Sequence, residues 1–216
     1  QSTIKRKPQI YKFLFFNYMR EATIKLYQFN ELSEEAQKKV IENMQEDDSF
    51  LMYDWYTFIY DDFKDRMYQE YSCTVDDIYF SGFYSQGDGA SFTGGIFIKD
   101  YLEATKQKSK YRSLWKYLEE YEPNIDIGQS GHYSHENTMY FNDHSFYEGT
   151  EKQQEQLYKI MEEIEDTFRE EARQLYKKLQ DEYEYLISDE CIKEEIINAE
   201  YEFYADGTRE PIYNLI

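Results

Sequence analysis

The sequence is poor in cysteine, proline and glycine, and it has no long hydrophobic run. Its 216 residues include 2 Cys, 3 Pro and 9 Gly. Cys73 and Cys191 show neither metal-binding spacing nor a disulfide framework, so we expect a reduced cytoplasmic chain. No stretch approaches the roughly 20 apolar residues that a membrane-spanning helix needs. The apolar run at 11–19 is shorter and lacks a small-residue cleavage site after it, so we expect no signal peptide.

Positive charge is also scarce. The chain has 24 Lys and Arg against 44 Asp and Glu, which gives a net charge of −20. Such a field repels nucleic acid and anionic membranes and favours basic partners, including proteins that themselves hold nucleic acid. Residues 1–28 carry a net charge of +5, so the remainder carries −25. We therefore predict a basic and aromatic N-terminal arm at 1–20, followed by a single domain at 21–216.

Aromatic residues, in contrast, are abundant. They make up 19% of the chain, with 24 Tyr and 15 Phe. The mean hydropathy is low, at −0.89, but tyrosine counts as polar on that scale although its ring buries a large apolar area. The composition therefore predicts a folded core built from Tyr and Phe. Exposed tyrosines would add a binding face, because they give large contact area at low entropic cost.

Five segments have the apolar spacing of helices, where side chains three and four residues apart share a face. They are 30–45, 46–71, 101–121, 150–187 and 188–199. Ser33, Ser49 and Ser188 are placed to cap the first, second and fifth of these helices. The second helix is expected to carry its apolar side chains on one face, namely Leu51, Trp55, Phe58, Ile59, Phe63 and Met67.

The segment 150–187 contains neither glycine nor proline. Its apolar residues recur every three or four positions, at about 3.67 residues per turn. They are Leu157, Met161, Ile164, Phe168, Ala172, Leu175, Leu179, Tyr183 and Leu186. This repeat predicts one nearly straight helix, about 55 Å long at about 1.5 Å per residue, packed on a sheet.

Alternating aromatic and β-branched residues predict the strands of that sheet. They lie at 23–29, 75–86, 90–100, 123–134, 137–143 and 201–213, the last with an Asp206-Gly207 turn. The combination predicts an α+β fold, in which a small antiparallel β-sheet packs against several α-helices, including one long helix in the C-terminal half.

The string "SGFYSQGDGASFTGG" at 81–95 holds five of the nine glycines. It lacks the lysine and hydroxyl of a P-loop, and a predicted strand rather than a helix follows it, so neither phosphate-binding motif fits. Gly87-Asp88-Gly89 instead suits a β-hairpin turn with positive φ, flanked by Gly82, Gly94 and Gly95 inside strands. Such a turn would present Gln86 and Asp88 to a partner.

All three histidines lie in the string "GHYSHENTMYFNDH", at His132, His135 and His144. In a strand His132 and His135 point to opposite faces, so a shared metal ion would require a bend between them. Asp88, His132 and His135 are the candidate metal ligands, and a water bound to such a metal would support hydrolysis. The alternative, favoured by the absence of HExxH, is a pair of hydrogen-bonded structural histidines. No serine lies in a GxSxG motif, and we predict neither catalytic residues nor a cofactor.

Acidic residues crowd the long predicted helix. They include Glu162, Glu163, Glu165, Asp166, Glu170 and Glu171. Rows of this kind can imitate the phosphates of a duplex and occupy a basic nucleic-acid channel. The alternative is a solvated helix face with ion pairs to Lys159, Arg169 and Arg173.

Four strings resemble a family of small proteins of bacteriophages and prophages, some of which are labelled as antitoxins of toxin–antitoxin systems. The strings are "LYQFNELSEEAQKKV", "DDIYFSGFYSQGDGASFTG", "GHYSH" and "LQDEYEYLISDECIKEEIINAEYEF". The likeness covers 21–207, and "SGFYSQGDGA" is its most specific part. The basic arm departs from the family, whose members begin near "TIKLYQF".

Small acidic phage proteins often inhibit host machinery, so the resemblance implies an interaction protein of the host bacterial cytoplasm rather than an enzyme. We expect an anti-CRISPR-like inhibitor that occludes the basic nucleic-acid-binding surface of a host defence factor and binds neither nucleic acid nor membrane directly. Its expected partner-binding residues are Gln86, Asp88, Glu162, Glu163, Asp166 and Glu170. The alternatives are an antitoxin that neutralises a cognate toxin and a small metal-dependent hydrolase that uses Asp88, His132 and His135.

Overall fold

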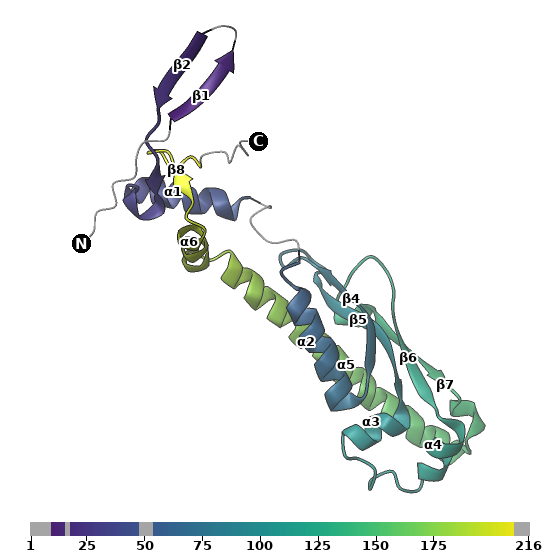
Figure 1. Ribbon diagram of the computed structural model, residues 1–216. Helices are drawn as coiled ribbons and strands as arrows, with labels where there is room; N and C mark the ends of the chain where they lie inside the picture. The colour runs from purple at the N-terminus through teal and green to yellow at the C-terminus, as the bar shows by residue number, and fades with distance from the viewer. Residues whose placement is uncertain (1–9, 16–17, 48–53, 210–216) are drawn as a thin grey trace. The chain divides into compact units, whose positions relative to one another are not determined.

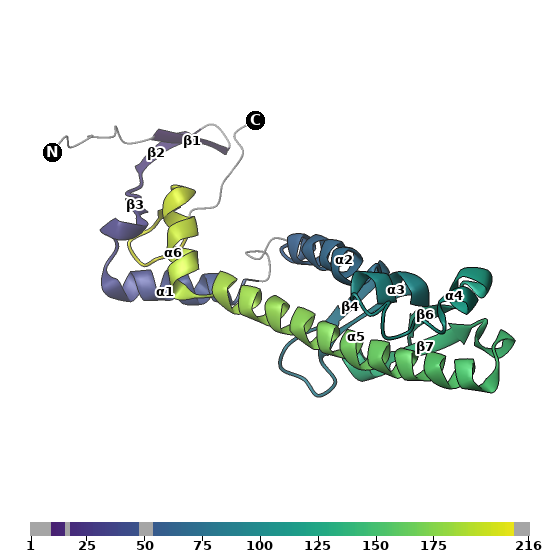
Figure 2. The ribbon, with the colours of Figure 1, turned by 90° about the horizontal axis from the view of Figure 1, so that it is seen from below.

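The computed structural model describes residues 10–15, 18–47 and 54–209 (Figures 1 and 2). The chain divides into two compact units. The larger is 54–183, and the smaller combines 1–53 with 184–216. The predicted boundary between an arm at 1–20 and a domain at 21–216 does not coincide with either boundary of these units. That division stays a prediction. Among the helices in these described ranges, we find none with an apolar stretch sufficient to span a lipid bilayer.

The larger unit is a four-stranded antiparallel sheet packed against helices, which confirms the α+β class. The strands, in the spatial order β4-β5-β6-β7, are Thr74–Ser81, Gly89–Phe97, Asn124–Gln129 and Met139–His144. The helices are α2 (Thr57–Tyr71), α3 (Ile98–Ala104), α4 (Trp115–Tyr121) and α5 (Glu151–Leu186). Side chains alternate across the sheet, since Ile125 and Ile127 are buried and Asp126 between them is exposed. The sheet thus has one buried face and one exposed face.

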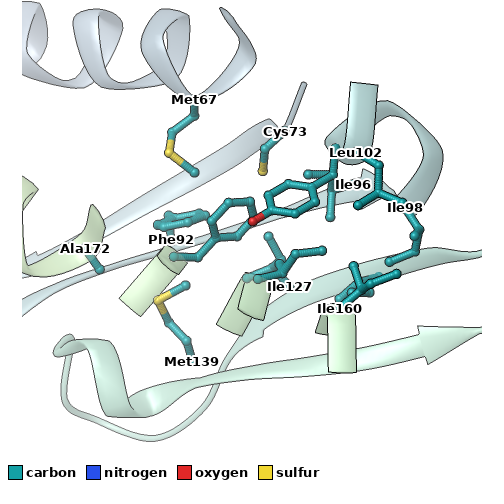
Figure 3. Packing of buried hydrophobic residues seen from close by; sticks show 14 of the residues in the cluster. Met67, Cys73, Phe92, Ile96, Ile98, Leu102, Ile127, Met139, Ile160 and Ala172 are labelled. Atoms are coloured by element: carbon teal, nitrogen blue, oxygen red, sulfur yellow. The ribbon is translucent and has the colours of Figure 1, made fainter. Parts of the chain in front are cut away.

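The buried face of the sheet and the helices share one hydrophobic core. Phe92 and Ile127 of the sheet pack with Met67 of α2 and with Ile160 and Ala172 of α5 (Figure 3). All five residues are at least 96% buried. Full burial of a large apolar side chain contributes roughly 1.5–3 kcal/mol, so this core is the main source of the unit's stability.

The long predicted helix is confirmed by α5, whose 36 residues span about 54 Å at about 1.5 Å per residue. Most of the predicted stripe is fully buried, whereas Met161, Tyr183 and Leu186 are partly exposed. Ile160 and Glu171 are also buried and were not part of the predicted stripe. Both lie next to it on the helix surface, because Ile160 is three residues after Leu157 and Glu171 three after Phe168.

Helix α2 follows the predicted face in part. Ile59, Phe63 and Met67 are buried and Trp55 is half-buried, but Phe58 is 58% exposed. The prediction for Phe58 was wrong. The buried row runs through Ile59, Phe63 and Met67 at a spacing of four residues, and Phe58 lies beside that row on the solvent side. The proposed cap Ser49 and the apolar Leu51 lie outside the described residues.

The single helix predicted at 101–121 is wrong, because the structure has α3 and α4 with a turn-rich connection between them. Lys106 adopts a left-handed φ of 60° and ends the first helix. The N–H groups of Lys106 and Gln107 donate to the carbonyls of Glu103 and Leu102, at 3.1 and 2.8 Å. This is the hydrogen-bond pattern of a Schellman motif. Tyr111 in this connection is buried in the core. Its apolar position therefore resembles that of a core residue in a helix, although the segment is not helical.

The smaller unit has its own core. Its elements are β1 (Ile10–Phe15), β2 (Tyr18–Thr23), β3 (Tyr27–Gln28), α1 (Glu34–Gln45), α6 (Asp189–Asn198) and β8 (Glu202–Phe203). The strand predicted at 23–29 is wrong in extent, since 24–26 separate β2 from β3. Val40 and Ile41 of α1 pack with Ile192 of α6 and Phe203 of β8. Gly207 has the left-handed φ, 81°, that the predicted turn requires.

Helix α1 begins with the predicted cap, because the Ser33 hydroxyl accepts a hydrogen bond from the Ala36 N–H at 3.3 Å. We expect Ser33→Ala to destabilise the first turn by about 1 kcal/mol and to speed amide exchange at Ala36 about fivefold. Hydrogen exchange followed by NMR measures this rate. Ser33→Asp supplies another acceptor and should retain slow exchange, whereas equal rates in Ser33→Ala and wild type would contradict the capping role.

Candidate functional site

The glycine-rich string forms the predicted β-hairpin, but its loop is longer than a tight turn. Strands β4 and β5 pair up to Ser81 and Gly89, which leaves the tip loop, defined as 82–88. Gly87 has a positive φ of 95°, as predicted, whereas Gly89 belongs to β5. Gly82 also has a positive φ, 41°, and lies in the loop, so its predicted place inside a strand is wrong.

Asp88 shapes the tip loop from within. One oxygen of its carboxylate, Oδ2, accepts a hydrogen bond from the Ser85 N–H at 2.6 Å. The Asp88 N–H donates in turn to the Ser85 carbonyl at 3.1 Å. A carboxylate has about four acceptor positions, so the bond to Ser85 leaves Asp88 able to accept further hydrogen bonds.

Aromatic packing fixes the same loop on α5. The ring centroid of Phe83 lies 5.6 Å from that of Tyr176 and 5.1 Å from that of Tyr183, both on α5. It also packs on Phe80 of β4, at 5.0 Å. The adjacent Tyr84 is 75% exposed. Phe83 therefore holds the loop in place, and the neighbouring Tyr84 presents its ring to solvent.

His132 does not lie in a strand, contrary to the strand predicted at 123–134, and His135 also lies outside the strands. β6 ends at Gln129 and β7 begins at Met139, which leaves a connection at 130–138 that we term the histidine loop. The Ser130 N–H donates to the Thr138 carbonyl at 3.0 Å, and the Thr138 N–H donates to the His135 carbonyl at 2.9 Å. These bonds turn the chain back on itself, so alternation of side chains does not continue through His132.

The imidazole rings have different surroundings. His135 Nδ1 accepts a hydrogen bond from the Asn137 N–H at 3.1 Å, so the neutral ring carries its proton on Nε2. His144 lies in β7 outside the histidine loop: its Nε2 contacts the Asp126 carboxylate at 2.8 Å, and both side chains are exposed on the sheet. His144 therefore belongs to the exposed face of the sheet and not to the histidine loop.

The tip loop and the histidine loop line a shallow, open, polar concavity of about 520 Å³, which we term the loop pocket. Its lining consists of Gln86, Gly87, Asp88, Tyr133, His135, Glu136 and Asn137. The structure thus brings together Gln86, Asp88 and His135, three of the residues singled out from the sequence. His132 does not contribute to this lining.

Two glycines allow the loops to approach so closely. A Cβ atom on Gly87 would lie 2.4 Å from the ring of Tyr133, and one on Gly89 would lie 2.5 Å from Cβ of His135. Real Cβ atoms do not tolerate such contacts, so any side chain at these positions would push the loops apart. The glycines of the hairpin therefore determine the shape of the loop pocket.

Helix α5 supplies charge behind the histidine loop. Glu136 Oε1 accepts hydrogen bonds from Arg173 Nε at 3.2 Å and from the Asn137 side-chain amide at 3.0 Å. Arg173 also pairs with Glu170 at 2.7 Å, and the hydrogen bonds to Glu170 and Glu136 raise the pKa of Arg173. Burial, followed by the charge of Asp88, raises the pKa of Tyr176. Asp88 thus faces the same region of α5.

The candidate metal ligands do not form a ligand set. In the part of the chain that the structure describes, no group of three or more His, Cys, Asp or Glu residues could hold a metal ion. Asp88 and His135 share the loop pocket, but His132 does not line it. The hydrolase hypothesis therefore gains no support from these residues.

The acidic residues predicted on α5 fall into two groups. Glu163 accepts from Gln107 and from Lys110, the latter at 3.3 Å, and Glu170 binds Arg173. Glu162 and Asp166 are exposed. The ion pairs expected along the helix are present in part, for example Lys159–Glu155 at 2.7 Å and Arg169–Glu165 at 3.2 Å. The role of the four acids in partner binding stays a prediction.

Sequence reasoning missed the pocket residues Tyr133 and Asn137, as well as the exposed Tyr84. Tyr84 and Tyr133 lie inside two of the strings on which the family resemblance rests, "SGFYSQGDGA" and "GHYSH". Their place in these strings could have marked them as candidate binding residues, because an exposed aromatic residue in a structured loop often takes part in binding.

The fold and the pocket define an α+β protein in which two adjoining loops form a polar recess beside a long helix. The chain belongs to the family described as a domain of unknown function (DUF8835), which it matches over residues 55–189. Nearly all of the larger unit, and both loops of the pocket, lie within that range. Neither a curated protein nor a solved structure shows a significant match.

Proposed function

We propose that this protein is an acidic phage-encoded inhibitor that binds a basic host protein and covers its nucleic-acid-binding surface. The observation that carries the proposal is the loop pocket, in which the carboxylates of Asp88 and Glu136 share the lining with the exposed ring of Tyr133, while Tyr84 lies on the adjoining tip loop outside the lining. Tyr84 is 75% exposed and Tyr133 is 57% exposed. Aromatic anchors next to carboxylates suit a protein surface rich in Lys and Arg.

The charge of the larger unit supports the same proposal. Residues 54–183 contain 27 acidic and 14 basic residues, a net charge of −13. A field of this sign speeds the encounter with a basic partner and repels free nucleic acid. The exposed acids of α5, Glu162 and Asp166, would contribute to that long-range attraction without direct contact.

In the proposed mechanism, the bound inhibitor replaces nucleic acid on the partner. Its carboxylates neutralise Lys and Arg side chains that otherwise contact phosphates, so nucleic acid loses the charge contacts that dominate its affinity. A host defence nuclease in the bacterial cytoplasm is the partner we favour. A cognate toxin with a basic surface would be blocked in the same way.

The proposal is tested by capture on the immobilised full chain from a nuclease-treated bacterial lysate. We expect a basic protein to be retained at about 50 mM salt and released more than tenfold at about 500 mM, because salt screens exposed charges. Once identified and purified, that protein should lose DNA or RNA binding when the chain is added. Retention that is indifferent to salt, or a captured protein that still binds nucleic acid, would contradict the proposal.

A charge-matched pair of variants locates the surface. Asp88→Asn combined with Glu136→Gln removes both pocket charges and retains hydrogen-bonding groups of the same shape. Glu120→Gln combined with Glu148→Gln removes two exposed charges elsewhere in the larger unit. We expect the first pair to lower affinity for the captured partner at least about tenfold and the second about twofold or less. Equal losses would show that total charge alone is responsible.

A further inference from the structure

We propose that the loop pocket binds one arginine side chain of the partner. The guanidinium group lies against the ring of Tyr133, and its N–H groups donate to oxygen atoms of the pocket. This inference rests on the proposed function and deepens it, because it names the side chain that the pocket recognises. It follows from three features of the pocket: an aromatic wall, a set of acceptors, and a guanidinium that the chain itself already binds at the rim.

The first feature is the aromatic wall. The rings of Tyr133 and His135 are stacked, with their centroids 6.2 Å apart and their planes 27° from parallel. Tyr133 remains more than half exposed. A flat aromatic surface favours the planar, weakly hydrated guanidinium of Arg, which stacks on rings, over the compact and strongly hydrated ammonium of Lys.

The second feature is the acceptor set around that wall. The lining offers the carboxylates of Asp88 and Glu136 and the amide oxygens of Gln86 and Asn137. A guanidinium presents five N–H donors in a rigid plane and forms charge-assisted bonds to carboxylates that are about twice as strong as neutral ones. An ammonium has three donors and cannot present them in a plane, so a set of several acceptors beside a flat ring favours Arg.

The third feature is the rim of the pocket, where a guanidinium is already bound. Arg173 of α5 donates from Nε to Glu136 at 3.2 Å and contacts Glu170 through Nη1 at 2.7 Å. This contact orients the Glu136 carboxylate from the helix side, while the side chain also lines the concavity. The partner's arginine would approach the same carboxylate from the opposite, open side.

The test is an NMR titration of the full chain with three blocked tripeptides, Gly-Arg-Gly, Gly-Lys-Gly and Gly-citrulline-Gly. Citrulline has nearly the shape of arginine but no charge. We expect the arginine peptide to shift the resonances of Tyr133 and His135 and to bind at least about fivefold more tightly than the lysine peptide. The citrulline peptide should bind at least about tenfold more weakly than the arginine peptide.

Matched variants assign the effect to the wall and the carboxylate. Tyr133→Ala and Glu136→Gln should each weaken the arginine peptide at least about fivefold, whereas Tyr133→Phe should retain its affinity. The controls are Tyr147→Ala and Glu148→Gln, which change exposed residues outside the pocket and should leave affinity unchanged. The dispersion of the remaining resonances shows whether each variant is folded. If Tyr133→Ala unfolds, Tyr133→Leu tests the wall, because it keeps a large apolar side chain but removes the aromatic face and should also weaken the arginine peptide.

The outcomes separate this inference from the proposed function. Equal affinity for the arginine and lysine peptides, or shifts that persist in Tyr133→Ala, would overturn arginine recognition. If no peptide binds while the chain still captures a basic partner in a salt-dependent way, the inference fails and the proposed function stands. If both the peptides and partner capture fail, both are overturned.

Discussion

Gly94→Ala is expected to destabilise the larger unit by about 3 kcal/mol, the upper end of what an added methyl group costs in a packed site. A Cβ atom at Gly94 would lie 1.9 Å from the Thr74 carbonyl oxygen. Backbone, not a flexible side chain, occupies that space, and Gly94 is held between Val75 of β4 and Ile127 of β6. The clash can be relieved only by separating paired strands, because Gly94 lies in the centre of the sheet.

The measurement is urea unfolding followed by tryptophan fluorescence. Trp55 and Trp115 are the two tryptophans of the chain and both lie in the larger unit, so the signal reports on that unit alone. We expect the midpoint to fall without a large change in slope, which identifies a loss of stability rather than a change in compactness.

The neighbouring glycine provides the control. A Cβ atom on Gly95 would meet the Ile125 carbonyl oxygen at 3.7 Å, an ordinary van der Waals distance. Gly95→Ala should therefore destabilise the unit by about 1 kcal/mol or less. Any loss is partly offset because alanine lowers the conformational entropy of the unfolded chain. Similar losses in the two variants would show that the close approach of β4 does not govern this position.

The sequence predicted those parts of the fold that local periodicity determines. The stripe on α5 and the capping serines Ser33 and Ser188 could be found because each depends on residues within a few positions of one another. The break after α3 could not, because Lys106 takes a left-handed conformation without being glycine. Tertiary packing of the connection overrides the local helical pattern there.

The candidate site was predicted as separate pieces. The strings identified Gln86, Asp88 and His135, but not that two loops from different hairpins would place them around one pocket. The strand predicted at 123–134 wrongly included His132, and only the backbone bonds of the histidine loop show where β6 stops. The glycines indicated close approach, yet no local rule names Tyr133 as the side chain that approaches Gly87.

Replacing Glu171 by alanine is the second change with a large expected effect. Glu171 is 5% exposed in the core between α2 and α5. Its carboxylate pairs with Arg66 Nη2 at 2.5 Å and accepts a hydrogen bond from the Tyr71 hydroxyl at 2.7 Å. The hydrogen bond to Glu171 raises the pKa of Arg66, and burial together with the same carboxylate raises the pKa of Tyr71. Two polar groups, the Arg66 guanidinium and the Tyr71 hydroxyl, therefore depend on the Glu171 carboxylate.

Loss of that carboxylate leaves Arg66 and Tyr71 without their shared partner in a largely apolar site. Breaking a buried pair on one side costs about 3–5 kcal/mol, but the Arg66 side chain is 22% exposed, so we expect about 2–4 kcal/mol for Glu171→Ala. The adjacent Glu170, whose ion pair with Arg173 is exposed, is the matched control and should cost less than about 1 kcal/mol on replacement by alanine. Tryptophan-monitored urea unfolding measures both.

A double-mutant cycle distinguishes the ion pair from the space that it fills. When both charges are replaced by apolar side chains of similar volume, as in Arg66→Met with Glu171→Leu, no buried charge is left unpaired. We therefore expect the double variant to be more stable than Glu171→Leu alone, with a coupling energy of about 2 kcal/mol between the two positions. Additive effects would mean that Arg66 reaches solvent or Glu70, 3.6 Å away, when Glu171 is absent. In that case the Tyr71 hydrogen bond and packing, rather than the charge pair, hold α2 against α5.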